Sequence, residues 1–320
     1  MKNTVAIIDM GTNTFHLLVA EFEGQNYKIT YRNSIAVKIG KDGINDGYIT
    51  EQGVSRALHA IQNFKSTLNT LSVKKILAFG TSALRVANNG AEIIQKIITE
   101  TGIETRIISG EEEATYIYEG VASAMKIDQK SLIVDIGGGS VEFIIGNEKE
   151  IFWKQSFEIG GQRLLEKYQK HDPILPEEID VLNDFFLQSL KPLSAAMTQY
   201  DPQVLIGSSG SFDTLSEIYC AKKNIKWHDN PETPLTIASF YEIFEEFKIK
   251  NRAERLQIPG MIEMRVDMIV VACCLIEFLL TNFSFNRVRV SSYSLKEGVL
   301  ASLIKTSISH LPPFKNANDQ

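Results

Sequence analysis

Residues 6–19 read AIIDMGTNTFHLLV, and residues 132–145 read LIVDIGGGSVEFII. The two segments align without gaps at an offset of 126 residues: an apolar run, an Asp, a Gly two positions later, a Thr or Ser five positions after the Asp, and a second apolar run. Short apolar runs bounded by turn residues predict buried strands. One copy alone would be explained by an ordinary hairpin. The repeat instead predicts two similar domains that face each other across a cleft.

The pattern around both copies predicts an α/β architecture. Around the first copy we expect strands at 5–9, 15–22, 27–39, 75–79 and 105–108 and helices at 51–71, 91–101 and 111–125. Around the second copy we expect strands at 131–135, 141–145, 150–157, 204–206 and 288–290 and helices at 163–169, 177–190, 267–279 and 295–308. Residues 1–125 with 300–311 are predicted to form the first domain, 126–299 the second, and 312–320 a polar tail.

The composition is that of an ordinary globular protein, with 44% hydrophobic and 22% charged residues in a chain of 320. The formal net charge is −6 and no run is rich in Lys or Arg, so we expect no binding to nucleic acid or to membrane surfaces. The three cysteines are too few for a disulfide framework, and Cys273 and Cys274 fall in an apolar run; a reducing cytoplasm fits best. That run, 268–280, contains Glu277 and is too short to span a bilayer.

The two repeated loops have the chemistry of phosphate-binding sites. Each joins two predicted strands, so neither is a dinucleotide-binding fingerprint, which requires a helix directly after the glycines. A tight Gly-rich turn presents several backbone N–H groups at one point, and such a nest binds phosphate oxygens. A type I′ or II′ turn would explain either loop alone. The twin copies favour phosphate binding by Gly11, Thr12, Asn13, Thr14, Gly137, Gly138, Gly139 and Ser140.

Two acidic residues, Asp9 and Asp135, end the strands that precede these loops. A carboxylate is a hard oxygen ligand, suited to Mg²⁺ that keeps most of its waters. We therefore expect Asp9 and Asp135 to face each other across the cleft with Mg²⁺, or Mn²⁺ in its place, and a phosphate-rich ligand.

Four segments in order resemble the motifs of the exopolyphosphatase and guanosine pentaphosphate phosphohydrolase family: 9–14 (DMGTNT), 80–85 (GTSALR), 108–114 (ISGEEEA) and 135–142 (DIGGGSVE). The resemblance implies two actin-like, ribonuclease H-like domains and hydrolysis of the terminal phosphate of inorganic polyphosphate or of pppGpp. The family commonly carries an additional C-terminal helical module. This chain resembles a short form without it, for which a homodimer is possible.

The resemblance also implies roles for individual residues. Glu113 corresponds to the general base that takes a proton from the attacking water, with Glu112 as the alternative; Glu111 is explained by the helix dipole alone. Glu142 corresponds to an acid that binds metal, together with Asp9 and Asp135, or that orients water. Arg85 corresponds to a phosphate ligand, and Ser82 is a plausible N-cap of its helix.

Other candidates leave their alternatives open at this point. The turn 208–211 fits either an anion site or simple helix capping. Arg163 fits the cleft or the surface, and Arg265 and Asp267 fit pairing or capping better than contact with substrate. Lys38 and Lys41 are further cations near the expected cleft. Rival functions are a small-molecule kinase of the same superfamily and a non-enzymatic sensor of polyphosphate or pppGpp. Without a clear purine pocket, we expect inorganic polyphosphate to be the better substrate.

Overall fold

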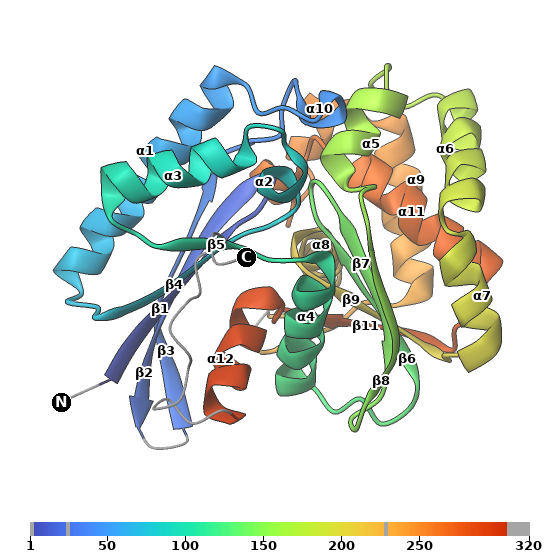
Figure 1. The fold of residues 1–320 in the computed structure, drawn as a ribbon. Helices are drawn as coiled ribbons and strands as arrows, with labels where there is room; N and C mark the ends of the chain where they lie inside the picture. Colours follow the sequence, from blue (N-terminus) through green and yellow to red (C-terminus); the bar gives the residue numbers. More distant parts are fainter. Residues whose placement is uncertain (1–2, 24–25, 227–229, 306–320) are drawn as a thin grey trace.

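The structure, a computed structural model, describes residues 3–23, 26–226 and 230–305 (Figure 1). Its first half consists of β1 (Asn3–Met10), β2 (Thr14–Glu23), β3 (Asn26–Ala36), η1 (Ile44–Asp46), α1 (Glu51–Thr70), β4 (Lys75–Gly80), α2 (Ser82–Val86), α3 (Gly90–Thr101) and β5 (Thr105–Ile107). Helix α4 (Gly110–Ala124) follows and leads into the second half.

The second half begins with β6 (Ser131–Ile136), β7 (Val141–Gly146) and β8 (Ile151–Phe157). It continues with α5 (Gly161–Tyr168), α6 (Pro176–Ser189), α7 (Lys191–Tyr200), β9 (Val204–Ser208), α8 (Gly210–Lys223), β10 (Glu232–Thr233), α9 (Ile237–Ile249), α10 (Arg252–Leu256), η2 (Glu263–Arg265), α11 (Ile269–Asn282) and β11 (Arg287–Ser291). Helix α12 (Leu295–Lys305) closes the described chain.

The two halves repeat one sheet topology. The first sheet has the order β3-β2-β1-β4-β5, and the second has β8-β7-β6-β9-β11 with the short β10 added at its edge. In each, the first three strands are antiparallel and the next two join in parallel. The added β10 pairs antiparallel with β11. The registers repeat as well, because Asp9 lies opposite His16 on β2 and Asp135 lies opposite Glu142 on β7. The predicted duplication and the predicted actin-like fold class are confirmed.

Helices α4 and α12 lie between the two sheets, and the remaining long helices cover the outer faces (Figure 1). Alternation along the strands separates the cores. On β1, Ala6 and Ile8 belong to the outer core under α1 and α3, whereas Val5 and Ile7 belong to the central core that α4 and α12 share with both sheets. On β6, Ile133 reaches the central core and its neighbours face the outer helices.

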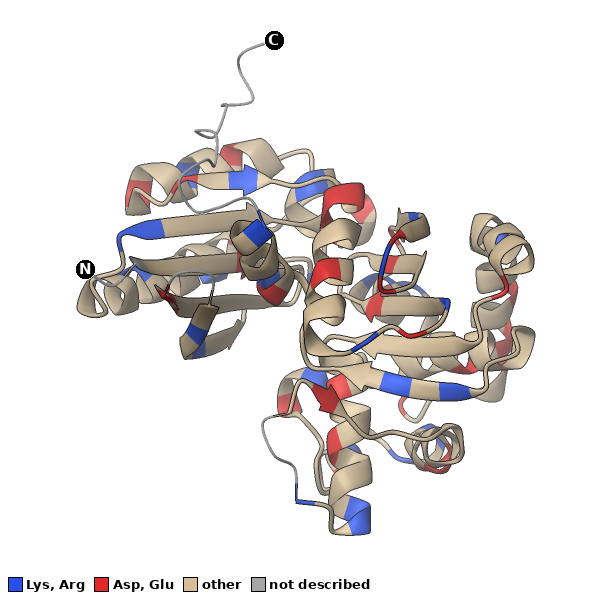
Figure 2. Cartoon of the chain, turned by 90° about the horizontal axis from the view of Figure 1, so that it is seen from below, with Lys and Arg blue, Asp and Glu red and all other residues tan. Residues whose placement is uncertain are grey.

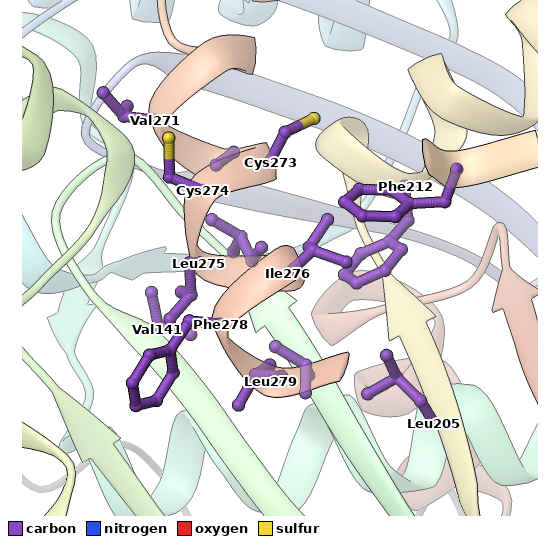
Figure 3. Close-up of a cluster of buried hydrophobic side chains, with 14 of the residues drawn as sticks. Val141, Leu205, Phe212, Val271, Cys273, Cys274, Leu275, Ile276, Phe278 and Leu279 are labelled. Carbon is purple, nitrogen blue, oxygen red and sulfur yellow. The ribbon is translucent and has the colours of Figure 1, made fainter. Parts of the chain in front are cut away.

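The outer core of the second half is built around α11 (Figure 3). Cys273 and Cys274 are fully buried in it as free thiols, beside Leu275, Ile276 and Leu279. The expectation that these cysteines act as small buried hydrophobic residues is confirmed. Within the described residues, no helix is both long and apolar enough to cross a bilayer. Acidic and basic residues occur on both halves (Figure 2).

Most expected elements are present, with shifted ends. The helix expected at 267–279 begins at Ile269, because the preceding residues form the short η2 and a turn. It extends to Asn282. The strand expected at 27–39 ends at Ala36, where the chain leaves the sheet edge. The C-terminal helix is described to Lys305; its predicted continuation to 308, the extension of the first domain to 311 and the tail at 312–320 lie outside the described residues.

Candidate active site

A cavity between the two halves collects the predicted loops and carboxylates. From the first repeat it is lined by Asp9, Gly11, Thr12, Asn13 and Thr14, and from the second by Asp135, Gly137, Gly138, Gly139, Ser140 and Glu142. Glu113, in the first turn of α4, also lines it. Arg85 lies beside the cavity and is bonded to Glu113. The sequence therefore identified one connected site from segments more than one hundred residues apart.

The alternation that builds the cores also directs these carboxylates. Asp9 shares the central face of β1 with Val5 and Ile7, and Asp135 shares that of β6 with Ile133. Glu142 shares the central face of β7 with Ile144, whereas Val141 and Phe143 face the outer helices. The predicted orientation of Glu142 toward the loops is therefore confirmed. The carboxylates reach the cavity where the apolar central core ends.

The two loops share one hydrogen-bonded turn. In the first, the Gly11 N–H donates to the Thr14 carbonyl at 3.1 Å, and in the second the Gly137 N–H donates to the Ser140 carbonyl at 3.0 Å. Among the hydrogen bonds of the described residues, none engages the backbone N–H groups at positions 12, 13, 138 and 139. Unpaired N–H groups that line a cavity are available to an anion.

The second loop is held from behind by the start of α5. The N–H groups of residues 160, 161 and 162 donate to the carbonyls of Gly139, Gly137 and Gly138 at 2.8–3.0 Å. These bonds engage the carbonyls of all three loop glycines. Gly139 of the second loop also lies close to Thr12 of the first loop and to Ser82 of α2. A Cβ atom at position 139 would collide with both of these side chains. Glycine is required at this close approach.

The start of α4 separates its three glutamates by role. Ser109 is the N-cap and accepts from the Glu112 N–H at 3.1 Å, and the Glu112 carboxylate accepts in return from the Ser109 N–H at 3.2 Å. Glu112 also accepts from Arg106 at 2.7 Å, so this alternative base belongs to the capping box and not to the cavity. The side chain of Glu111 is 78% exposed. Glu113 alone is buried and lines the cavity.

Arg85 connects Glu113 to a residue that the sequence did not suggest, Glu158. Its Nη1 donates to Glu113 Oε2 at 2.8 Å and to the Ile108 carbonyl at 3.2 Å, and its Nη2 donates to Glu158 Oε1 at 3.0 Å. Ser82 is not the predicted N-cap: it is the first residue of α2, whose N-cap is Thr81, and its hydroxyl donates to Glu158. The short helix α2 thus directs both side chains toward the second half.

The site holds an excess of buried acid. Burial and the nearby Glu142 charge raise the pKa of Glu113 well above its ordinary value. Burial and Asp135 raise the pKa of Glu142 to about 8, with Ser156 as its hydrogen-bond donor at 2.6 Å. Burial raises the pKa of Asp9 to about 7, with a further contribution from Asp135. Such shifts indicate groups whose charged forms lack sufficient compensation.

Three further charged residues line the cavity wall. Sequence reasoning missed Asp213 on α8 and Lys296 at the start of α12, and it expected Arg265 in η2 to pair or cap instead. Arg265 is only 8% exposed, and no hydrogen bond or ion pair of the described residues engages its guanidinium. The expectation that Arg265 pairs or caps locally is therefore wrong. No local pattern marks these residues, because each comes from an element that reaches the cavity only through the tertiary fold.

The other weak candidates are now placed. Asp267 does pair, accepting from Lys38 Nζ at 2.7 Å and from Arg252 Nε at 2.6 Å. Lys38 is therefore engaged across the two halves and does not line the cavity. Arg163 is neither a surface residue nor a cavity residue: its guanidinium donates to the Gly139 carbonyl and, across the halves, to the Ile44 carbonyl, both at 2.8 Å.

The turn after β9 was expected to serve either an anion or helix capping. Ser208 donates to Asp135 Oδ2 at 3.1 Å, and Ser209, with a φ of 71°, lines the cavity at the start of α8. No side-chain cap is present on this helix. The turn is therefore part of the cavity wall and not a capping device.

The donor chemistry of the cavity fits a hard cation, but not the three-carboxylate cage expected from Asp9, Asp135 and Glu142. Within the described ranges, no three His, Cys, Asp or Glu side chains come together as a metal-binding group. The side chains of Glu142 and Asp135 are oriented instead by Ser156 and Ser208. Asp213 Oδ1 and Thr12 Oγ1 are buried without a partner. Oxygen donors in this arrangement suit Mg²⁺ that takes one or two carboxylates and completes its shell with phosphate oxygens and water.

The repeated strand order and the phosphate-type loops define this protein as a member of the actin-like fold class. A model of the Ppx/GppA phosphatase family matches residues 18–307. The chain belongs to the Ppx/GppA phosphatase family and is a hydrolase by that membership.

Two solved structures show how far the similarity extends. An exopolyphosphatase from Cytophaga hutchinsonii has 43% sequence identity to this chain, covers 94% of it with 98% of its own chain, and superposes with a TM-score of 0.92. The Ppx/GppA family member of Aquifex aeolicus has 24% identity, with coverage of 97% and 100% and a TM-score of 0.77, and supports the fold.

Proposed function

We propose that this protein is an exopolyphosphatase, which hydrolyses the terminal phosphoanhydride bond of inorganic polyphosphate with Mg²⁺. The observation that carries the proposal is the cavity in which two Gly-rich loops with free N–H groups face each other beside the buried Glu113. Such a cavity surrounds a terminal phosphate with donors from both halves. Family membership and the 43% identity to a protein named as an exopolyphosphatase support the same reaction class.

In the proposed reaction, the loop N–H groups and Arg265 bind the oxygens of the terminal phosphate and neutralise charge as it develops. Glu113 accepts a proton from the water that attacks the terminal phosphorus, and the shortened polyphosphate leaves with the bridging oxygen. A raised pKa makes a carboxylate a stronger base, provided that it is ionised when substrate is bound. Bound Mg²⁺, held through Asp9 or Asp135, would offset the charge of the phosphate chain and of the neighbouring carboxylates.

The cavity lining favours polyphosphate over a nucleotide. Its apolar members are Ile117 and Leu295, and among the described lining residues no Phe, Tyr or Trp offers a surface on which a purine would stack. Burial lowers the pKa of His16 well below its usual value, so this ring is neutral and supplies no cation. A chain of phosphates gives repeated charge-assisted contacts that need no base-binding pocket.

Phosphate release from polyphosphate, pppGpp and ATP, measured side by side with Mg²⁺, tests the proposal. We expect polyphosphate to have the highest kcat/KM. A pppGpp value more than about tenfold above polyphosphate, equivalent to ~1.4 kcal/mol of transition-state binding, would assign the second family activity instead. Binding of polyphosphate without release of phosphate from any of the three would assign a sensor.

A further inference from the structure

Glu158 lies in the connection between β8 and α5 and contacts both halves of the molecule. Its Oε2 accepts hydrogen bonds from Ser82 in the first half and from Arg163 Nη2, at 3.1 Å, in the second. Arg163 in turn donates to the carbonyls of Gly139 and Ile44. This oxygen of Glu158 therefore belongs to the contact that holds the two halves together beside the phosphate loop.

The other oxygen of Glu158 has a different partner. Oε1 accepts from Arg85 Nη2 at 3.0 Å, while Arg85 Nη1 donates to Glu113 Oε2 at 2.8 Å. The one guanidinium that reaches the proposed base is thus shared between two carboxylates. Both N–H groups of Arg85 Nη1 are engaged, by Glu113 and by the Ile108 carbonyl, and one N–H of Nη2 is directed to Glu158. A phosphate oxygen that uses this N–H of Nη2 must replace Glu158.

The exposure of the two carboxylates decides which one yields. The side chain of Glu113 is 10% exposed, and that of Glu158 is 37% exposed. A carboxylate that loses its partner in a buried position keeps the full cost of desolvation, whereas one at the mouth of the site is solvated by water. Glu158 Oε1 is therefore the contact that an incoming phosphate replaces at lower cost. Oε2 can keep its bonds to Ser82 and Arg163 during this exchange.

We propose that Glu158 is a positioning residue that holds the Arg85 guanidinium while the site lacks substrate and is exchanged for a phosphate oxygen when substrate binds. The inference rests on the proposed function of the cavity. Glu158 then has two effects: it fixes the direction of Arg85 before substrate arrives, and it competes with phosphate for the same nitrogen. Removal of its charge should tighten binding of both substrate and product phosphate.

The variant Glu158→Gln keeps the size and an acceptor oxygen but removes the charge. Glu166→Gln is the matched control, because Glu166 also joins the two halves. Its carboxylate accepts hydrogen bonds from the Asp42 N–H at 2.9 Å and from Asn45 Nδ2 at 3.4 Å. No hydrogen bond or ion pair of the described residues joins Glu166 to Arg85. We expect Glu158→Gln to lower KM for tripolyphosphate and the inhibition constant of inorganic phosphate by about fivefold, with kcat within about threefold of wild type. Glu166→Gln should change neither constant.

Equal shifts of KM and of the phosphate inhibition constant in the two variants would mean that Glu158 only joins the halves, and this would overturn the inference. Unchanged or weaker phosphate inhibition in Glu158→Gln would overturn it as well. If Glu158→Gln does not fold, Glu158→Asp, which withdraws the carboxylate from Arg85 by one methylene, should give the same tightening. Calorimetric titration of both proteins with inorganic phosphate decides the point without turnover. A wild type that binds phosphate but releases none from polyphosphate would contradict the proposed function and leave this comparison valid.

Discussion

At the scale of single residues, the cavity is defined by a charge imbalance. Five of its lining residues are acidic and two are Lys or Arg, with Arg85 adjacent; the acids are Asp9, Glu113, Asp135, Glu142 and Asp213. Burial is the main reason for the raised carboxyl pKa values, and mutual repulsion adds to it. A site of this kind is unfavourable when empty at neutral pH and becomes favourable when it gains positive charge.

The substitution Glu113→Gln tests the proposed base. Gln retains the size of the side chain and can still accept from Arg85, but it cannot take a proton from water. We expect turnover to fall by ~10²–10⁴, with substrate binding close to wild type, in a steady-state assay of phosphate release. Glu111→Gln, on the exposed side of the same helical turn, should be nearly silent. Retention of more than about a third of wild-type turnover by Glu113→Gln would show that the base is another residue.

The metal requirement can be tested at Asp135. Two carboxylates and a polyanion leave negative charge that a hard cation offsets, so we expect activity to require Mg²⁺ or Mn²⁺ and to disappear with a chelator. Asp135→Asn should raise the Mg²⁺ concentration needed for half-maximal activity, and a metal titration of both proteins measures the change. Full activity after exhaustive chelation would refute this prediction.

The pKa of Glu142 predicts how stability varies with pH. The group titrates at about 8 in the folded protein, against an ordinary value of 4.5, so the folded state holds a proton that the unfolded chain has released. The stability that this group contributes is complete below about pH 4.5 and is lost as pH rises through about 8. The Tm of metal-free wild type minus that of Glu142→Gln should therefore fall between about pH 5.5 and 8.5, by at least ~2 °C. A difference that does not change with pH would contradict the shift.

At the scale of elements, the N-terminus of α4 performs two tasks with neighbouring residues. Ser109 and Glu112 satisfy the backbone donors of the first turn, and this fixes the direction in which Glu113 leaves the helix. The capping role of Glu112 and the proposed chemical role of Glu113 can therefore be separated by mutation, although the two residues are adjacent.

Replacement of Glu112 by Ala should lower stability without removing the base. The change deletes the return bond to Ser109 and the ion pair with Arg106, so we expect a loss of ~1 kcal/mol in the free energy of unfolding. Turnover should stay within about threefold of wild type. Urea denaturation and the phosphate-release assay together measure both effects. A collapse of turnover with intact stability would return Glu112 to the list of candidate bases.

The elements and the loops were predictable from the sequence because their signals are local. The apolar runs and the Asp-Gly spacing are each contained within about fifteen residues. The repeat also predicted that the two copies face each other. In the structure, the repeated strand order brings Asp9 and Asp135 to the same cavity.

The residues that the sequence did not reveal share a different origin. Arg265 is the last residue of the short η2 before α11, and Glu158 lies in a short connection; neither occupies a position with a characteristic spacing. Their roles come from which side chains the fold brings opposite them, and a periodicity argument carries no such information. The same reason applies to Lys38, which lies at the contact between the halves but whose partner there, Asp267, the sequence did not indicate.

At the scale of the whole molecule, a second pocket lies at the contact between the halves, and we call it the groove. Its basic lining residues are Lys38, Lys41, Lys170, Arg252 and Arg255, and Gln162 also lines it. Lys38 and Arg252 pair there with Asp267, and Arg255 pairs with Asp172. Gln162 also accepts a hydrogen bond from Asn13 of the phosphate loop at 3.0 Å, so the groove adjoins the cavity. Lys41 is 54% exposed, and its ammonium lies 3.9 Å from Asp42, a distance that leaves it free to rotate toward a ligand.

This groove predicts how activity depends on chain length and salt. The net charge of −6 repels a polyanion at long range, so a phosphate chain gains only from cations in a focused groove, and those contacts weaken as salt screens them. We expect chains of moderate length to be preferred over both tripolyphosphate and very long chains, with kcat/KM falling as salt rises. If only longer chains reach the groove, Lys41→Ala should lower kcat/KM for the moderate chains by about threefold and leave that for tripolyphosphate unchanged. Lys126→Ala is the matched control, because Lys126 is 74% exposed and lines a different cavity.

The test is to measure kcat/KM for three chain lengths at two salt concentrations. An equal loss for tripolyphosphate and for longer chains in Lys41→Ala would exclude this groove as the path of the phosphate chain.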